Sequence, residues 1–431
     1  MKLKLILTFN FLILFLDCFC QGNIAITHEL YHQYQGDFVF EDGIYITGGP
    51  MGEIKGSVLY LDPVNSHLGG IFIPVNKTTF SSAFPPGSKS KIEFKINKKK
   101  TVEGMWWTNE KGEKKYAKKE ISPIVHKVNF DNGDIALAGE LILPKGEGPF
   151  PVIINVHGSG RQDRHDGPWS SFFTRYGIAV LSYDKRGVGE STGRYETAGY
   201  EDLASDVLTG ISFLKNHPKI NAELIGIQGS SEGGWVGSIA ASKSEDVAFL
   251  LVRVGSGVSG FETYMHEIKN ELAEKDLSKQ EWVEAVKLER AYYNLALSNV
   301  SIDSINSFIR MARSKYDWFE DAFNGWDHLD PEYRIKMRET GPIDPVDSLR
   351  NITIPVLWFL ADEDENVPYA LSEPRIKLAL EEAGNEDYQV VTIKGVKHNF
   401  ILQNKDGSSK YVDGYWDKMA DWLQKRGFTK Y

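Results

Sequence analysis

The sequence predicts an α/β protein with a mostly parallel sheet, preceded by a smaller domain made of β-strands. In the C-terminal two thirds, continuous apolar runs of strand length alternate with helix-length segments, a pattern typical of a buried parallel sheet. Between residues 37 and 119, short runs alternate apolar and polar residues and are separated by glycine and proline, which indicates half-buried strands. The two patterns predict two folded units of different class.

Length and composition are those of an ordinary globular protein. The chain has 431 residues, of which 42% are hydrophobic and 25% are charged, and this composition disfavours both wholesale disorder and a polytopic membrane protein. At roughly 150 residues per domain, this length predicts two or three folded units. The formal net charge of −10 disfavours nucleic acid as the main partner.

Residues 1–20 have the pattern of a secretory signal peptide. Two lysines precede an apolar stretch from Leu5 to Leu16, which is too short to span a bilayer. We expect cleavage after Cys20, a secreted or periplasmic location, and no stable membrane insertion after the leader is removed. A lipid anchor is less favoured, because neither Cys18 nor Cys20 follows a small residue. Since both cysteines of the chain lie here, we expect no disulfide in the mature protein.

Residues 21–122 are expected to form the small β-rich accessory domain. Its last third is basic: from Lys89 to Lys119, eleven lysines stand against four glutamates, a local charge of +7. The favoured interpretation is the solvated face of an edge hairpin, whose lysines discourage strand pairing; the alternative is a dock for an anionic polymer or surface. Trp106 and Trp107 are expected in the strand core, with stacking on sugars as the alternative.

Residues 123–431 are expected to form the α/β domain. Asn132-Gly133 marks a hairpin at its start. The regular alternation then fails once, at about residues 256–349, where amphipathic helices replace strands and one helix begins with a capping box from Ser278 to Glu281. This segment is predicted to be a helical insertion. We expect the buried strands at residues 152–156, 179–183, 224–228, 248–254, 354–360 and 388–393.

A serine lies at the centre of a tight turn that follows one of these strands. Gly229-Ser230-Ser231-Glu232-Gly233 fits the G-x-S-x-G pattern and leads into a helix-compatible stretch. The turn from strand to helix is sharp, and a side chain at either outer glycine would collide with neighbouring backbone. Ser231 is therefore the candidate nucleophile. The alternative is an ordinary helix-entry turn with a serine N-cap.

A nucleophilic serine needs a base, and the base needs an orienting acid. His398 follows the last expected strand and is the histidine with the right place in chain order. Four acidic side chains crowd the loop after the strand at residues 354–360. Among them Asp364 is favoured as the acid, and Asp362 is the alternative.

A glycine-rich turn, His157-Gly158-Ser159-Gly160, follows another apolar strand. Backbone N–H groups in such a turn can meet the negative oxygen that develops when a carbonyl is attacked. The candidate donors are the backbone amides of Ser159 and Glu232, so at Glu232 position matters more than the side chain. The alternative is a purely structural turn. No pair of histidines sits at ligand spacing with a carboxylate, so the sequence predicts no metal site.

Together these motifs resemble the α/β-hydrolase superfamily, specifically its bacterial esterase-type members with a short N-terminal accessory domain. The resemblance covers residues 124 to the C-terminus and also rests on the turn from Asp184 to Ser191 and on Lys397-His398. It implies an α/β-hydrolase fold, with an eight-stranded, mostly parallel sheet flanked by helices and a helical cap in the insertion. It also implies a catalytic triad of Ser231, His398 and Asp364.

Two places depart from the pattern of this superfamily. Ala361 stands where many relatives have glycine before the acid, and Val396-Lys397 replaces the small residues often found before the histidine. Neither departure removes a catalytic group. The resemblance further implies that Asp184 and Arg186 brace the loop that carries them rather than take part in the chemistry.

The activity implied by the resemblance is hydrolysis of carboxylic esters in two steps of acyl transfer. His398 takes the proton of Ser231 as the hydroxyl attacks, Asp364 holds the imidazole, and water releases the acyl-enzyme. No cofactor is required, and the expected partner is a small-molecule ester. Most large side chains of the insertion are expected in the cap core, although some can line an acyl pocket: Tyr264, Met265, Tyr292, Trp318, Phe319, Phe323 and Trp326.

Three alternative functions stay open at this point. A serine peptidase of the prolyl oligopeptidase type shares the catalytic domain, but about a hundred residues are too few for the propeller that such enzymes carry. Thioester hydrolysis or acyl transfer uses the same groups. A catalytically silent binding protein would be expected to have lost Ser231 or His398, and both are present.

Overall fold

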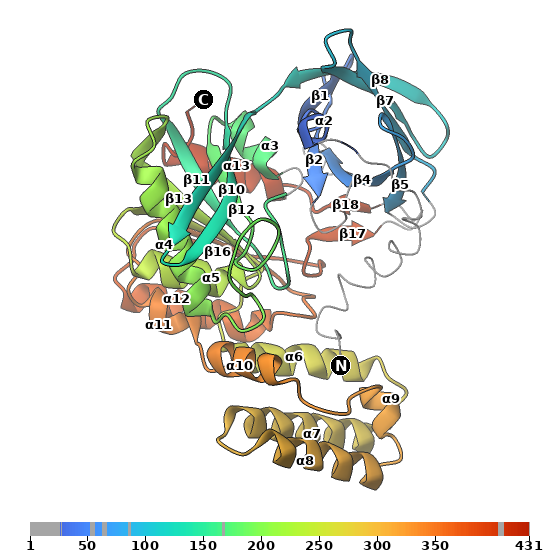
Figure 1. The fold of residues 1–431 in the computed structure, drawn as a ribbon, viewed down its shortest axis with the longest axis vertical. Coiled ribbons are helices and arrows are strands. Elements are labelled where there is room, and N and C mark those ends of the chain that lie inside the picture. Colours follow the sequence, from blue (N-terminus) through green and yellow to red (C-terminus); the bar gives the residue numbers. More distant parts are fainter. Residues whose placement is uncertain are drawn as a thin grey trace.

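The computed structural model describes residues 26, 28–51, 57–62, 67–84, 88–165, 169–403 and 409–430. The expected signal peptide, residues 1–20, lies outside this part of the chain. The described residues form a β-barrel, an α/β domain and a helical cap (Figure 1). Within the described part, no helix has the length and apolar character needed to cross a membrane.

The α/β domain is built on an eight-stranded sheet with the strand order β16-β15-β14-β13-β11-β12-β10-β9. The pairings of β10 with β9 and with β12 are antiparallel, and the remaining pairings are parallel. This confirms the α/β-hydrolase fold that the resemblance implied. The strands are β9 (Ile124–Asn132), β10 (Ile135–Leu143), β11 (Phe150–Val156), β12 (Ala179–Tyr183), β13 (Ile220–Ser230), β14 (Val247–Arg253), β15 (Val356–Ala361) and β16 (Tyr388–Ile393).

The first two strands form the expected hairpin. Asn132 pairs with Ile135, so the two loop residues are Gly133 and Asp134, one position later than the Asn-Gly signal itself. Gly133 has a φ of 60°, a backbone conformation that glycine adopts at little cost. The turn therefore sets the register of the antiparallel edge of the sheet.

Helices cover both faces of this sheet because its central strands are apolar on both sides. One apolar core includes Leu203, Trp235 and Ile376, from three helices on one face. The other core includes Phe172 and Trp416, from two helices on the opposite face. These helices are α4 (Tyr200–Lys215), α5 (Gly233–Ser242) and α12 (Tyr369–Glu382) on the first face, and α3 (Trp169–Arg175) and α13 (Tyr415–Lys425) on the second.

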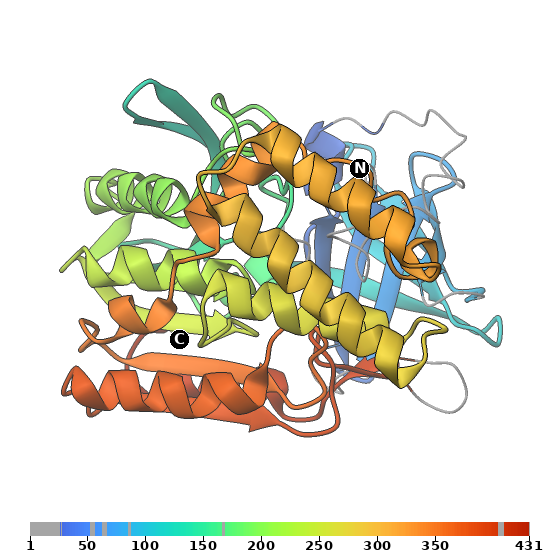
Figure 2. The same ribbon diagram turned by 90° about the horizontal axis from the view of Figure 1, so that it is seen from below.

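The insertion after β14 is helical, as expected. Ser278 and Glu281 form the capping box: the serine Oγ accepts from the Glu281 amide at 3.3 Å, and the glutamate accepts from the Ser278 amide at 2.7 Å. Figure 2 looks onto the cap, whose helices lie across the α/β domain. The helices are α6 (Gly260–Ala273), α7 (Lys279–Leu297), α8 (Ile302–Lys315), α9 (Phe319–Phe323), α10 (Pro331–Thr340) and α11 (Pro345–Leu349).

The cap has an apolar core of its own. All seven large side chains that the sequence placed in the insertion contribute to it, five of them buried and two packed against the buried ones. Tyr292 and Trp326 meet edge to face, with 4.5 Å between their ring centroids. These side chains therefore hold the cap helices together: Tyr264, Met265, Tyr292, Phe319 and Trp326 are buried, and Trp318 and Phe323 pack against them.

The accessory domain is an antiparallel barrel. Its eight strands follow the order β4-β3-β2-β1-β8-β7-β6-β5, and the pairing of β4 with β5 closes the ring. Aromatic side chains such as Tyr34, Phe38 and Phe94 fill the interior. The strands are β1 (Gly36–Phe40), β2 (Tyr45–Met51), β3 (Ser57–Asp62), β4 (His67–Pro74), β5 (Thr79–Phe84), β6 (Lys91–Ile96), β7 (Val102–Thr108) and β8 (Lys114–Ile121); the short helix α2 (His28–His32) precedes them.

The edge-hairpin interpretation of the lysine-rich segment is wrong. Its strands β6, β7 and β8 are each paired on both sides within the barrel, so their lysines guard no open edge. Along β6, exposed lysines alternate with buried residues, whereas Lys119 on β8 is partly buried and donates to the backbone oxygen of Gln33. Trp107 packs against Phe72 of the barrel core, as expected, whereas Trp106 is 37% exposed.

A hairpin that follows the last strand of the α/β sheet joins the sheet of the barrel. The hairpin of β17 (Ile401–Gln403) and β18 (Ser409–Tyr411) follows β16 in the chain, yet β18 pairs with β4 of the barrel. The sequence assigned this hairpin to the α/β domain, which was predicted to begin at residue 123, but the hairpin pairs with the barrel. Because only three residues of β18 extend the barrel, no apolar run revealed it.

Candidate active site

Ser231 lies on the sharp turn between β13 and α5. Its φ is 53°, a strained value for a residue with a side chain. A Cβ on Gly229 would lie 2.1 Å from the backbone oxygen of Gly233, and one on Gly233 would lie 2.3 Å from that of Val156. Both glycines are thus needed for the close backbone approach, as the sequence predicted. The turn lifts the serine side chain off the end of the sheet.

Loops that follow β15 and β16 bring an acid and a histidine to this serine. His398 Nε2 lies 3.1 Å from Ser231 Oγ, and His398 Nδ1 lies 2.8 and 2.9 Å from the two carboxylate oxygens of Asp364. The Asp364 side chain is fully buried and also accepts hydrogen bonds from the amides of Asn366 and Val367. The structure therefore brings together the three residues expected from the sequence, in hydrogen-bond contact.

Asp362, the alternative acid, points elsewhere. Its carboxylate accepts a hydrogen bond of 2.6 Å from the amide of Gly395 and lies 3.5 Å from Lys394 Nζ. It therefore holds the turn that precedes His398 and does not contact the imidazole. The contacts of the two carboxylates therefore differ, and only Asp364 contacts the imidazole of His398.

The surroundings of His398 favour its protonated form. Burial alone would lower the pKa of this imidazole, but the charge and hydrogen bonds of Asp364, together with the charge of Glu267, outweigh burial and raise it. Since Asp364 holds Nδ1, the Nε2 atom is the one that can exchange a proton with the serine. This is the arrangement that a general base requires.

The expected oxyanion donors lie on the two turns beside the serine. Ser159 is in the glycine turn after β11, and Glu232 directly follows Ser231. Within the described ranges, neither backbone amide has a hydrogen-bond acceptor in the protein. Gly158 packs close to the serine, since a Cβ placed on it would lie 3.4 Å from Ser231 Cβ.

A buried ion pair that sequence reasoning missed joins these two turns. Lys185 Nζ lies 2.7 Å from Glu232 Oε1 and donates to the backbone oxygens of Gly158 and Gly160. Both charged side chains are 4% exposed. The side chain of Glu232 therefore has a structural partner, beyond the positional role the sequence suggested. Lys185 stands inside the marker turn from Asp184 to Ser191, which was the available signal.

The remaining polar residues of this region brace the backbone. His157 Nε2 contacts the Tyr183 backbone oxygen at 2.7 Å, and burial lowers the pKa of His157 to about 4, so it is a neutral structural residue. Asp184 pairs with Arg164, and Arg186 forms two 2.8 Å hydrogen bonds with the carboxylate of Asp206. These contacts agree with the bracing role expected for Asp184 and Arg186.

The first cap helix lies over the acid loop. His266 Nε2 is 3.1 Å from the backbone oxygen of Asp364, and Asn270 donates to that of Glu365 at 2.8 Å. Glu267 on the same helix accepts a 3.1 Å hydrogen bond from the Asn366 side chain, and burial raises the pKa of Glu267 to about 7. Sequence reasoning missed Glu267, because helical periodicity does not show which polar residue faces the catalytic loops.

The fold and this constellation define a member of the α/β-hydrolase superfamily. Residues 132–369 match the family described as X-Pro dipeptidyl-peptidase (S15 family). This match spans more than half of the chain, and the protein belongs to that family. The matched segment includes Ser231 and Asp364, whereas His398 lies beyond its end.

Several individual proteins to which this chain is similar are hydrolases. The chain is 24% identical to the esterase EstD of Thermotoga maritima over 327 residues, which cover 71% of this chain and 70% of the relative. It is 26% identical over 155 residues to the mitochondrial palmitoyl-protein thioesterase ABHD10 of Rattus norvegicus, covering 36% of this chain and 50% of the relative. A solved esterase of Pyrococcus furiosus has a TM-score of 0.44 and 16% identity, covering 70% of this chain and 92% of that one. The family match and the esterase relative found by sequence identify the protein as a hydrolase.

Proposed function

We propose that this protein is a serine hydrolase that cleaves carboxylic esters through an acyl-enzyme intermediate. The observation that carries the proposal is the continuous line of hydrogen bonds from Ser231 through His398 to Asp364. A serine hydroxyl, a base with one free ring nitrogen and a buried acid are the three parts that acyl transfer needs.

In the proposed mechanism, Ser231 Oγ attacks the ester carbonyl while His398 Nε2 takes its proton. The imidazolium that forms is stabilised by Asp364, which stays ionised. The negative oxygen of the tetrahedral intermediate accepts hydrogen bonds from the backbone amides of Ser159 and Glu232. His398 then protonates the leaving alcohol, and a water molecule repeats the sequence to release the acid.

The similarity to an esterase over 71% of the chain supports an ester substrate. The family match favours a second candidate, hydrolysis of a peptide bond after proline. A dipeptidyl peptidase must hold the positive α-amino group of its substrate, which requires an ionised carboxylate near the serine. Glu267 is the cap carboxylate whose charge acts on His398, and it already accepts a hydrogen bond from the Asn366 side chain.

The test is to measure hydrolysis of p-nitrophenyl esters of increasing acyl length alongside dipeptidyl X-Pro p-nitroanilides. We expect ester turnover, with no turnover of the anilides. Ser231→Ala should reduce the turnover number by about 10⁴ or more, since removing a nucleophilic serine of this kind removes nearly all chemistry. Ser230→Ala, one position away, is the matched control and should retain activity.

Two outcomes would overturn the proposal. Turnover of the anilides in preference to the esters would establish the peptidase candidate. Ester turnover that survives Ser231→Ala would show that the serine is not the nucleophile. If neither outcome is observed, the dependence of ester turnover on acyl length describes the size of the acyl pocket.

A further inference from the structure

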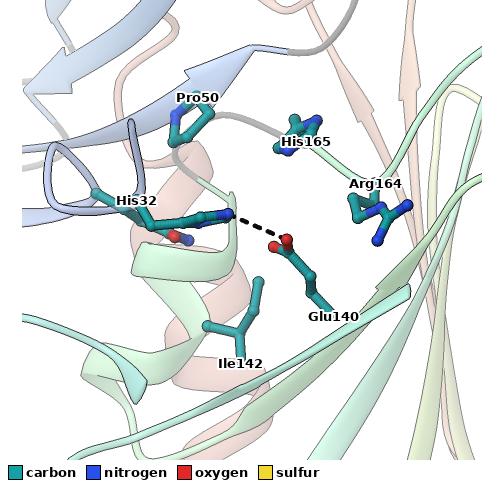
Figure 3. A pocket seen from close by; sticks show the side chains of 7 residues that line it. His32, Pro50, Glu140, Ile142, Arg164 and His165 are labelled. Carbon is teal, nitrogen blue, oxygen red and sulfur yellow. Dashed lines mark ion pairs between the residues drawn. The ribbon is translucent and has the colours of Figure 1, made fainter. Parts of the chain in front are cut away.

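A second cluster of titratable side chains lies between the barrel and the α/β domain. His32 ends helix α2 at the start of the barrel, Glu140 lies on β10, and His165 follows the glycine turn after β11. One ligand atom from each residue can be chosen so that all three lie within 4.8 Å of one another. Figure 3 shows the three side chains around a small cavity, with His32 Nε2 and Glu140 Oε1 3.0 Å apart.

Burying an ionised carboxylate in this cluster costs free energy unless a positive charge lies close to it. Glu140 is 1% exposed, and a carboxylate so deeply buried needs a cation beside it. The guanidinium of the neighbouring Arg164 pairs with Asp184 and Glu190. Asp163 adds a further carboxylate next to His165. This cluster therefore gathers imidazole and carboxylate side chains, the groups that bind divalent transition metals.

Asp163 orients the imidazole of His165. Its Oδ1 accepts from the backbone amide of His165 at 3.0 Å and lies 3.1 Å from the ring Nδ1. When Nδ1 donates that hydrogen bond, Nε2 carries the lone pair that a metal requires. A carboxylate on the second ring nitrogen is the usual support for a histidine that ligates a metal.

The space between the ligands suits a single ion. The cavity lined by His32, Glu140 and His165 has a volume of about 10 Å³, close to the smallest space that holds one water molecule. A single protonated histidine is the competing way to neutralise Glu140. Zinc binding distinguishes the two, because a metal requires both imidazoles to be neutral. The ring centroids of His32 and His165 lie 5.9 Å apart.

We propose that His32, Glu140 and His165 bind one divalent transition-metal ion, Zn²⁺ in the first instance. Two imidazole nitrogens and one carboxylate oxygen form a ligand set that zinc takes in proteins, with water completing the tetrahedron. The ligands come from both domains, so the ion would fasten the barrel to the α/β domain. It would also fix the loop that leads from the Ser159 turn to His165.

The sequence expectation of no metal site rested on ligand spacing along the chain. Here the two histidines and the glutamate are far apart in sequence, and only the docking of the barrel brings them together. Short-range spacing therefore had no means of revealing this site. The site lies apart from the Ser231 constellation and does not depend on the proposed ester hydrolysis.

The test is a zinc titration of the tag-free chain without the expected signal peptide, after dialysis against a chelator. Isothermal titration calorimetry should give one high-affinity zinc ion per chain, and Tm should rise with zinc and fall again with chelator. Mg²⁺ alone should give neither effect, because histidine nitrogens are poor ligands for magnesium. Absence of saturable zinc binding near one per chain would overturn the proposal without any variant.

Variants then assign the ion to these residues. His32→Gln and His165→Gln should each weaken zinc binding by at least about tenfold, and Asp163→Asn by about tenfold through the orientation of His165. His126→Gln, on the exposed strand β9, is the control and should bind as the wild type does. His398→Gln separates the junction from the catalytic histidine and should also bind normally. Zinc binding unchanged in both His32→Gln and His165→Gln would contradict the assignment.

Discussion

The two polar clusters of this protein are assembled in different ways. The Ser231 site takes its side chains from turns at the ends of neighbouring strands in one sheet, and its glycines are required by close backbone contacts. The junction cluster of His32, Glu140 and His165 joins two domains, and none of these three described residues has a left-handed backbone. A site that needs an unusual backbone leaves a motif in the sequence, whereas a site that needs only convergent side chains does not.

The largest expected effect separates the two carboxylates of the acid loop. Asp364→Asn should lower kcat by about 10⁴, because the amide no longer holds the imidazole in the productive tautomer. Asp362→Asn is its matched control, and we expect activity within a few-fold of the wild type, since Asp362 contacts only the Gly395 turn and Lys394. Ester turnover by the two variants measures the difference. Equal losses of kcat in the two variants would show that Asp364 has no role distinct from that of Asp362.

The next effect concerns stability at the catalytic turns. Lys185→Met removes one partner of a buried ion pair and leaves the Glu232 carboxylate uncompensated, which should cost about 3 kcal/mol of unfolding free energy. Urea denaturation measures the change. Activity should fall as well, because Lys185 ties the Gly158 turn to the residue after the serine.

The double variant Lys185→Met with Glu232→Gln provides the control for that result. Removing both charges eliminates the uncompensated carboxylate, so part of the stability should return. Losses that add in the double variant would show that the two side chains do not act as a pair. Recovery of stability without recovery of activity would assign to the pair a role in placing the two turns.

Much of the catalytic domain could be predicted from sequence, for identifiable physical reasons. Strand β12 is buried at every position and mostly apolar, and this pattern predicted its bounds to the residue, whereas β11 and β13 begin two and four residues earlier than predicted. Ser231 and His398 were identifiable because they follow strands in a fixed chain order. The choice between Asp362 and Asp364 needed the structure, since two carboxylates two residues apart have equivalent sequence signals.

The barrel was less predictable. Alternating strands indicated a β-domain, but ring closure depends on the pairing of β4 with β5, which no local pattern specifies. For the same reason the lysines of β6 to β8 were assigned to an open edge. The short strand β18, which pairs with β4, has three residues and no apolar run. Long-range pairing, rather than local propensity, decided each of these features.

A third prediction sharpens the comparison between the domains. Arg175 on α3 pairs with Asp37 of the barrel, whose side chain is 1% exposed, and its guanidinium lies 3.6 Å from the ring centroid of Tyr45. Arg175→Met should cost about 2 kcal/mol, because it leaves a buried carboxylate without its charged partner. Thermal unfolding and limited proteolysis of the barrel measure the loss of docking.

Lys215→Met is the control for this ion pair. Lys215 pairs with Asp246 within the α/β domain, and both side chains are largely exposed, so its loss should cost no more than about 1 kcal/mol. If the two variants are equally stable, the contact between Arg175 and Asp37 contributes nothing to domain docking. A single cooperative transition that moves to lower temperature in Arg175→Met alone would show that the domains unfold together.

The smallest effect concerns the cap and the pH dependence of catalysis. In the proposed mechanism His398 must be neutral to accept the serine proton, so kcat/KM should rise with pH through the pKa of this imidazole. Ionised Glu267 stabilises the imidazolium and raises the pKa of His398. Glu267→Gln removes that charge, and the acid limb of the profile should therefore move to lower pH. Glu262→Gln, exposed on the same helix, should leave the limb in place, and a shift to higher pH in Glu267→Gln would show that the cap helix acts on His398 by some means other than this charge.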